Sequence, residues 1–258
     1  DGDGDRCLLI ETTHCGFKII DGDRIADNLL NCVTHSGNDW TLSASIESDL
    51  SLTTNLNRFP TSVTVSETAV GDRWLSFKLS NNKINQFITN SSLPSVLGVE
   101  DSGHIVLASP HPNQSENWSL VGDGAMTLVA FLLATTKLEL TSLMQRGWKQ
   151  RLSVKDVDRS KWDGRNDLSD IVEKTLFQKL SDFSEVSQWH RTTIDGEPNL
   201  MLITCLFANT KLSIGVRNSG TQAKISVSAR LEHGGHNNGI QEAIDEACNL
   251  LAKHMISH

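Results

Sequence analysis

Three carboxylates on alternate residues open the 258-residue sequence, and their spacing suggests chemistry. The stretch DGDGDR places Asp1, Asp3 and Asp5 two residues apart, with glycines between them and Arg6 after them. Like charges at this spacing repel one another unless a cation or backbone donors lie among them. Carboxylate oxygens are the ligands that hard divalent cations prefer, and glycine permits the turn that makes them converge. The stretch therefore predicts a metal site.

The arginine after the carboxylates narrows the chemistry of this site. A calcium-binding EF-hand loop also begins with alternating aspartates, but it needs Gly at its sixth position and Glu at its twelfth, where this chain has Arg6 and Thr12. An acidic terminus exposed to solvent is a second alternative and stays open. Arg6 is better explained if the metal also holds a phosphate, whose oxygens a guanidinium can grip. The stretch thus suggests phosphoryl chemistry.

A second candidate site is a loop rich in hydrogen-bond donors, in the segment VRNSGTQAK between two predicted strands. The loop residues are Arg217, Asn218, Ser219, Gly220 and Thr221. They combine a cation, an amide and two hydroxyls with a glycine that lets backbone N–H groups face outward, which suits an anion such as phosphate. An ordinary hairpin turn is the alternative interpretation.

A third candidate is the turn in VEDSGHIV, which carries Glu100, Ser102 and His104. The carboxylate and hydroxyl could hydrogen-bond sugar hydroxyls, and the histidine could move protons near neutral pH. A structural histidine is the alternative. The segment AVGDRW is a weaker candidate, because its Asp72 could simply cap the helix that follows.

Composition limits the class of protein. Hydrophobic residues make up 38% and charged residues 21% of the chain, which is ordinary for a globular protein. The net charge of -8, without a visible cluster of Lys and Arg, argues against a nucleic-acid partner. Five cysteines without a CxxC pair indicate reduced thiols in a cytoplasmic protein. The longest apolar run, residues 125–134, is too short to cross a membrane and predicts a buried helix.

The order of hydrophobic patterns predicts an α/β fold in the first half of the chain. Two short strands, 7–10 and 17–20, precede a helix that Asp21 or Asp23 caps. Strand and helix patterns then alternate up to residue 143, which favours an α/β/α layer with a mixed, mainly parallel sheet. The expected strands lie at 41–46, 62–65, 95–99 and 104–108, and the expected helices at 51–56, 73–79 and 125–138.

The second half predicts a smaller α+β domain. Residues 145–165 are polar and without clear period, so we expect a linker there. A helix at 167–180, strands at 200–207, 211–216 and 224–231, and a closing helix at 239–255 follow.

Six stretches, taken in order, resemble the α-D-phosphohexomutase superfamily, which interconverts sugar 6-phosphates and sugar 1-phosphates. They are DGDGDR at 1–6, DGDRI at 21–25, VGDRW at 70–74, GVEDSGH at 98–104, VGDG at 121–124 and RNSGT at 217–221. The pattern is most similar to the phosphoglucosamine mutases, which implies glucosamine 6-phosphate as substrate. Val99, Asp101 and the pair Gln222–Ala223 depart from the family pattern. Phosphomannomutase, phosphoglucomutase and a non-catalytic sugar-phosphate-binding homologue therefore stay open as alternatives.

The resemblance implies roles for the candidate residues. Asp1, Asp3 and Asp5 would bind Mg²⁺, with Arg6 beside the phosphoryl group in transfer. Glu100 and Ser102 would hold sugar hydroxyls, His104 would act as general acid or base, and Asp72 with Arg73 would orient the sugar. The 217–221 loop would clamp the phosphate that is not being transferred.

The resemblance also implies the domain order. Residues 1–20 would end the metal-loop domain, 21–145 would form the α/β sugar-recognition domain, and 146–258 would form a phosphate-binding domain similar to the TATA-binding-protein fold. Family members transfer the phosphoryl group through a phosphoserine and a sugar bisphosphate. That phosphoserine lies in an N-terminal domain that these 258 residues do not match. We therefore expect an isomerase whose present chain has no turnover without those N-terminal domains, and neither a nucleic acid nor a membrane as partner.

Overall fold

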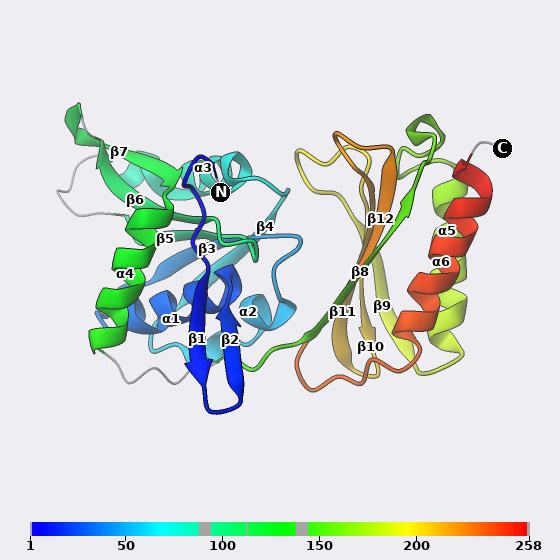
Figure 1. The fold of residues 1–258 in the computed structure, drawn as a ribbon, viewed down its shortest axis with the longest axis horizontal. Coiled ribbons are helices and arrows are strands. Elements are labelled where there is room, and N and C mark those ends of the chain that lie inside the picture. The colour runs from blue at the N-terminus through cyan, green and yellow to red at the C-terminus, as the bar shows by residue number, and fades with distance from the viewer. Residues whose placement is uncertain (1, 88–93, 112, 138–143, 257–258) are drawn as a thin grey trace. The chain divides into compact units, whose positions relative to one another are not determined.

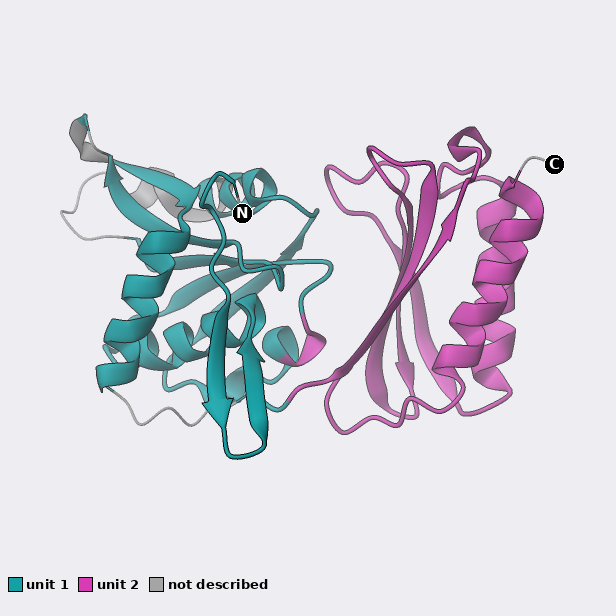
Figure 2. Ribbon diagram, in the orientation of Figure 1, with its two compact units in different colours: residues 1–48, 52–145 teal, residues 49–51, 146–258 magenta. Residues whose placement is uncertain are grey.

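The computed structural model describes residues 2–87, 94–111, 113–137 and 144–256 (Figure 1). They form two compact units, one of residues 1–48 and 52–145 and the other of residues 49–51 and 146–258 (Figure 2). Residues 1–20, expected to end a separate domain, belong to the first unit here. That domain assignment stays a prediction.

The first unit contains a two-stranded hairpin and a five-stranded sheet with helices. Its elements are β1 (Leu9–Thr13), β2 (Gly16–Ile20), α1 (Gly22–Thr34), β3 (Trp40–Ser45), α2 (Leu50–Thr54), η1 (Leu56–Arg58), β4 (Val63–Thr68), α3 (Asp72–Phe87), β5 (Val96–Val99), β6 (Ile105–His111), β7 (Gln114–Gly122) and α4 (Gly124–Lys137). The two strands expected before α1 are present and pair as an antiparallel hairpin. Of the two expected caps, Asp21 is the one observed, and its side chain accepts a hydrogen bond from the Arg24 amide at 3.2 Å.

The sheet of the first unit is mixed, in the order β4-β3-β5-β6-β7. Strand β3 runs parallel to β4 and β5, whereas the β5–β6 and β6–β7 pairs are antiparallel. The expected α/β class with a mixed sheet is confirmed, and both antiparallel pairs involve β6. Only a short turn connects β5 to β6, and a parallel pair needs a long crossover connection. Strand β7 was missed by the sequence analysis.

Helices cover both faces of this sheet. Leu97 and Val99 of β5 pack into the core that α1 and α4 share, whereas Val96 packs with Leu75 and Leu79 of α3. Successive side chains of a strand point to opposite faces of the sheet, so the apolar residues of β5 pack against helices on both faces. The α/β/α arrangement expected from the sequence is therefore confirmed.

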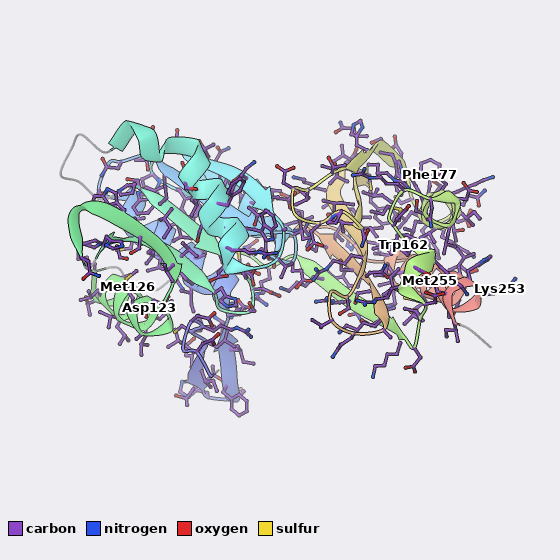
Figure 3. The ribbon with its side chains drawn as sticks, turned by 90° about the horizontal axis from the view of Figure 1, so that it is seen from above. Asp123, Met126, Trp162, Phe177, Lys253 and Met255 are labelled. Atoms are coloured by element: carbon purple, nitrogen blue, oxygen red, sulfur yellow. The ribbon has the colours of Figure 1, made fainter. Side chains whose placement is uncertain are left out.

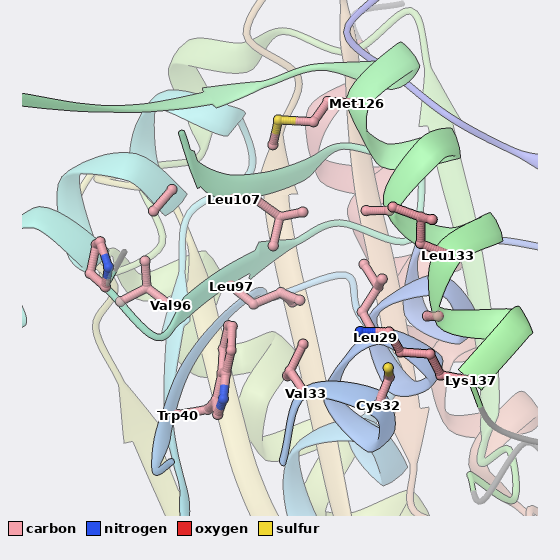
Figure 4. A pocket seen from close by; sticks show the side chains of 14 residues that line it. Leu29, Cys32, Val33, Trp40, Val96, Leu97, Leu107, Met126, Leu133 and Lys137 are labelled. Atoms are coloured by element: carbon pink, nitrogen blue, oxygen red, sulfur yellow. The ribbon is translucent and has the colours of Figure 1, made fainter. Parts of the chain in front are cut away.

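Helix α4 corrects the expectation of a buried helix at 125–134. Phe131 and Ala134 face the core, but Val129, Leu132 and Leu133 are more than half exposed. One helix face can contact α1 and the sheet, and the remaining apolar residues of the run lie outside that face. An apolar cavity of about 370 Å³ lies between α4, α1 and the sheet (Figure 4). Its lining offers few polar groups, so it does not suit a sugar phosphate.

The second unit is a five-stranded antiparallel sheet, in the order β8-β12-β11-β10-β9, with two long helices. Its elements are β8 (Trp148–Lys155), η2 (Arg159–Lys161), α5 (Asp167–Ser181), β9 (Val186–Thr192), β10 (Met201–Phe207), β11 (Thr210–Asn218), β12 (Lys224–Leu231) and α6 (Ile240–Met255). The expected α+β domain is confirmed in class.

The prediction of a linker at 145–165 is wrong, because strand β8 occupies most of the first half of this range and η2 lies in the second half. Leu152 and Val154 of β8 pack against the core, and the intervening positions are polar. A strand with one polar face has few apolar residues, so its composition resembled a linker. Strand β9, also absent from the expected elements, is similarly polar.

Helices α5 and α6 pack on one face of the second sheet. The core on this face includes Met255 of α6 and Trp162 (Figure 3). Both side chains are buried, at 0% and 2% exposure. The indole Nε1 of Trp162 donates to the Asn199 carbonyl at 2.9 Å, so this large side chain is buried with its polar atom satisfied. The strand positions that face the helices are apolar, and the alternate positions point to the opposite face.

A buried ion pair joins separate elements of the first unit. Arg58 Nε and Nη2 each lie 2.9 Å from Asp27 Oδ1, and Arg58 Nη2 donates to the Leu52 carbonyl at 3.2 Å. The Met144 amide donates to Asp27 Oδ2 at 3.0 Å. Both charges are thus withdrawn from water but surrounded by partners. Such a pair is costly to break from one side.

We expect Arg58→Ala to lower the free energy of unfolding by about 3–5 kcal/mol, because it leaves the Asp27 carboxylate buried without its cation. Replacing both partners, as in Asp27→Leu with Arg58→Met, should cost less than this single change. Urea unfolding followed by circular dichroism measures both. A loss below about 1 kcal/mol in the single variant would contradict the buried pair.

Candidate functional site

The segment that precedes β1 lies along two turns of the first unit. The Cys7 amide donates to the Gly103 carbonyl at 3.0 Å, and Arg6 and His104 form an isolated antiparallel bridge. The Gly124 amide donates to the Gly4 carbonyl, also at 3.0 Å. Backbone hydrogen bonds therefore hold the DGDGDR stretch against the SGH turn and the start of α4.

The backbone of the DGDGDR stretch approaches residues 103 and 124 so closely that both positions require glycine. A Cβ on Gly103 would lie 2.5 Å from the Cys7 carbonyl oxygen, and the φ of +98° already disfavours other residues there. A Cβ on Gly124 would overlap the Arg6 carbonyl oxygen. The glycines of SGH and VGDG therefore allow the acidic stretch to reach the histidine turn.

We expect Gly103→Ala to destabilise the chain by about 1–3 kcal/mol, because it combines a strained φ with a steric clash against the backbone. Hydrogen exchange at the Cys7 amide should accelerate as well, since that amide bonds to residue 103. Gly2→Ala is the matched control, because no atom lies within 4 Å of its added Cβ. Equal stability and exchange in the two variants would contradict the glycine requirement.

His104 lies between two carboxylates. Its Nε2 is 2.8 Å from Asp5 Oδ2, and its Nδ1 is 3.1 Å from Glu100 Oε2. Arg6 Nε also approaches Nε2, at 3.3 Å. Nε2 can donate to Asp5 or accept from Arg6, so the proton on this nitrogen decides which contact forms. The arrangement can hold a proton and release it at Nε2.

The electrostatics of Asp5 follow from these neighbours. Burial raises the pKa of its carboxyl group, but the hydrogen bond and charge of His104 and the charge of Arg6 outweigh burial, so the pKa lies below its usual value. Asp5 is therefore ionised at neutral pH.

Glu100 organises the turns around the histidine. Its Oε1 accepts a hydrogen bond from the Gly71 amide, and its Oε2 accepts from the Ser102 hydroxyl at 3.1 Å as well as contacting His104. The residue is only 4% exposed, so these protein donors replace water around a buried carboxylate. The structure thereby gives Glu100 a positioning role; its expected contact with sugar hydroxyls stays a prediction.

The VGDR turn brings Asp72 and Arg73 to the start of α3. Asp72 Oδ1 accepts from the Arg73 amide at 2.7 Å, and the Arg73 guanidinium lies 5.0 Å from the Trp74 ring centre. Both residues line an open groove of about 480 Å³ with Phe77 and Trp118. A ligand in this groove would contact both residues, and their expected contact with a sugar stays a prediction.

The donor set fits a hard cation in part. Asp5 Oδ1 is buried and accepts no hydrogen bond, although Arg6 Nε lies 3.8 Å away, and an unsatisfied carboxylate oxygen suits such a cation. Asp3 is exposed, and Asp1 lies outside the described residues. Among the residues that the structure describes, no three His, Cys, Asp or Glu side chains converge as metal ligands. The metal assignment stays a prediction.

The expected phosphate loop lies in the second unit, after β11. Arg217 Nη1 donates to Glu197 Oε1 at 2.9 Å. Asn218 Nδ2 donates to the carbonyls of Arg159 and Trp162 at 3.0 and 2.9 Å, so its donors position the loop and its role toward phosphate stays a prediction. Gly220 and Thr221 are exposed, and Ser219 is partly buried.

Arg159 supports this loop and was missed by the sequence analysis. Its Nη1 donates to the carbonyls of Ser219 and Gly220 at 2.7 and 3.0 Å. These bonds turn loop carbonyls toward a cation. The Ser219 amide donates to the Lys224 carbonyl at 2.9 Å, so the amides that could serve an anion are those of Gly220 and Thr221. Because Arg159 lies in the supposed linker, only the contact itself could have identified it.

Comparison of this sequence with known protein families shows the family to which the chain belongs. Residues 21–151 match the family model for the α/β/α domain III of phosphoglucomutase/phosphomannomutase. The chain belongs to the phosphoglucomutase/phosphomannomutase family.

Similar relatives include the phosphoglucosamine mutases of Kocuria rhizophila and of an Arthrobacter species. They are 31% and 32% identical to this chain over 167 and 168 residues, which cover 62% of this chain and 32% of each relative. The chain thus spans about a third of the length of these relatives.

A solved structure, a phosphoglucomutase/phosphomannomutase family protein from Burkholderia thailandensis, shares the fold with a TM-score of 0.54 and 17% identity. The match covers 96% of this chain and 45% of that protein. In the described part of the chain, no helix is long and apolar enough to span a bilayer.

Proposed function

We propose that this chain is part of a phosphohexomutase that moves a phosphoryl group between the 6- and 1-positions of a hexose phosphate, in the cytoplasm. The observation that carries the proposal is the Asp5–His104–Glu100 arrangement in a chain of the mutase family. It places a carboxylate and a proton-transfer group together although they are separated by 99 residues. The names of the relatives favour glucosamine 6-phosphate as substrate.

Each residue has a distinct part in this proposal. Asp5 and Asp3, with Asp1, would hold Mg²⁺, which supplies charge neutralisation for phosphoryl transfer when bound. His104 exchanges a proton with a sugar hydroxyl from Nε2, while Glu100 fixes the orientation of its ring. Arg6 binds the oxygens of the phosphoryl group in transfer. The 217–221 loop binds the other phosphate through its amides and hydroxyls.

We expect Asp5→Asn to weaken Mg²⁺ binding at least tenfold, because it removes the charge of a ligand whose free oxygen is buried. Isothermal titration calorimetry with MgCl₂ measures the affinity. Asp195→Asn, in an exposed turn of the second unit, makes the same change in charge and should bind like the unaltered chain. Equal weakening in both variants would contradict a site at Asp5.

We expect the 258-residue chain alone to convert no glucosamine 6-phosphate, because the proposed phosphoserine lies outside these residues. The purified chain, incubated with Mg²⁺ and the sugar phosphate, is followed by ³¹P NMR. The same chain should nevertheless bind the sugar phosphate. Product formation would contradict the need for a phosphoserine segment, whereas absence of binding would contradict the proposed function itself.

A further inference from the structure

The face of the second sheet that points away from α5 and α6 is strongly basic along two strands. Val154 of β8 and Ile225 of β12 are cross-strand partners, and both pack toward the helices. The residues at alternate positions of both strands therefore lie on the opposite face. The positions on this face are Lys149, Arg151, Ser153 and Lys155 in β8, and Lys224, Ser226, Ser228 and Arg230 in β12. They include no carboxylate, although the chain carries a net charge of -8.

Two lysines on this face are direct cross-strand neighbours. Lys155 pairs with Lys224 in the antiparallel register, so their Cβ atoms are about 5 Å apart. Like charges directly opposite one another repel, and neither lysine forms an ion pair within the part of the chain that the structure describes. An anion between the two ammonium groups would convert this repulsion into attraction.

The lysine pair lies beside the candidate phosphate loop. The neighbouring row on the same face consists of Ser153, Ser226 and Arg217, and Ser153 Oγ lies 2.8 Å from Ser226 Oγ. Arg217 is the first residue of the 217–221 loop, and Lys224 follows that loop directly. Two hydroxyls and three cations from three strands thus lie beside the loop, and of these cations Arg217 is paired with Glu197.

We propose that Lys155 and Lys224 form an anion subsite that binds the phosphate group of the sugar phosphate together with the 217–221 loop. This inference rests on the proposed function. Two ammonium groups suit a dianionic phosphate, and the serine hydroxyls can donate to its remaining oxygens. Rigid strands carry the subsite, so its geometry does not depend on the conformation of the exposed loop residues.

The test is calorimetric titration of the 258-residue chain with glucosamine 6-phosphate at low salt. Lys155→Gln and Lys224→Gln should each weaken binding about tenfold, the effect of losing one charged hydrogen bond. Lys155→Arg, which keeps the charge, should retain most of the affinity. Lys253→Gln is the matched control, because Lys253 is exposed on α6, which covers the opposite face of the sheet (Figure 3).

Thermal unfolding without ligand separates binding from folding. Lys155→Gln should leave the Tm unchanged or raise it, because it relieves repulsion. A lowered Tm with unchanged sugar-phosphate affinity would overturn the inference and give the lysine a structural role. Weakening by Arg217→Ala but by neither lysine variant would also overturn it while leaving the proposed function intact. Absence of binding by the unaltered chain would overturn the proposed function and the subsite together.

Discussion

The buried carboxylate of Glu100 is the constraint on which the site of the first unit depends. It accepts from the Gly71 amide, the Ser102 hydroxyl and His104, so it joins the VGDR turn to the SGH turn. A buried carboxylate needs these donors to remain charged. Because it satisfies one nitrogen of the imidazole, it leaves the other directed at Asp5. Glu100 therefore determines which nitrogen of His104 is available for proton transfer, although Glu100 itself need not touch the reacting atoms.

Local patterns were sufficient to predict most elements, but not those with one polar face. Helix α1 combines a capping aspartate with apolar residues at helical spacing, so cap and periodicity agree. Strand β8 alternates Leu152 and Val154 with polar residues, and this polar composition concealed its two-residue period. Helix α4 was predicted as a helix for the right reason, but its burial depended on tertiary contacts that composition does not contain.

In the candidate site too, contacts between residues close in sequence could be predicted, whereas contacts between distant residues could not. Glu100 and His104 are four residues apart on one turn, so their association could be expected from sequence. The approach of Asp5 to His104 depends on backbone contacts at Gly103 and Gly124, and nothing in the local sequence specifies which carbonyl each glycine meets. The resemblance assigned Asp5 to a metal and His104 to proton transfer, but it did not predict their contact. Arg159, which no motif included, became visible only through its bonds to the loop carbonyls.

Net charge is a poor guide to anion binding when strand register concentrates one sign of charge. The absence of a Lys and Arg cluster was inferred from the linear sequence, where Lys155 and Lys224 are 69 residues apart. Antiparallel pairing makes them neighbours, and the two-residue period places both on the face opposite the helices. The repulsion between them is small beside the stability of a five-stranded sheet, so the fold tolerates it. A locally unfavourable pair that the fold does not require is best explained by a ligand, because a bound anion supplies the opposite charge that the sheet lacks.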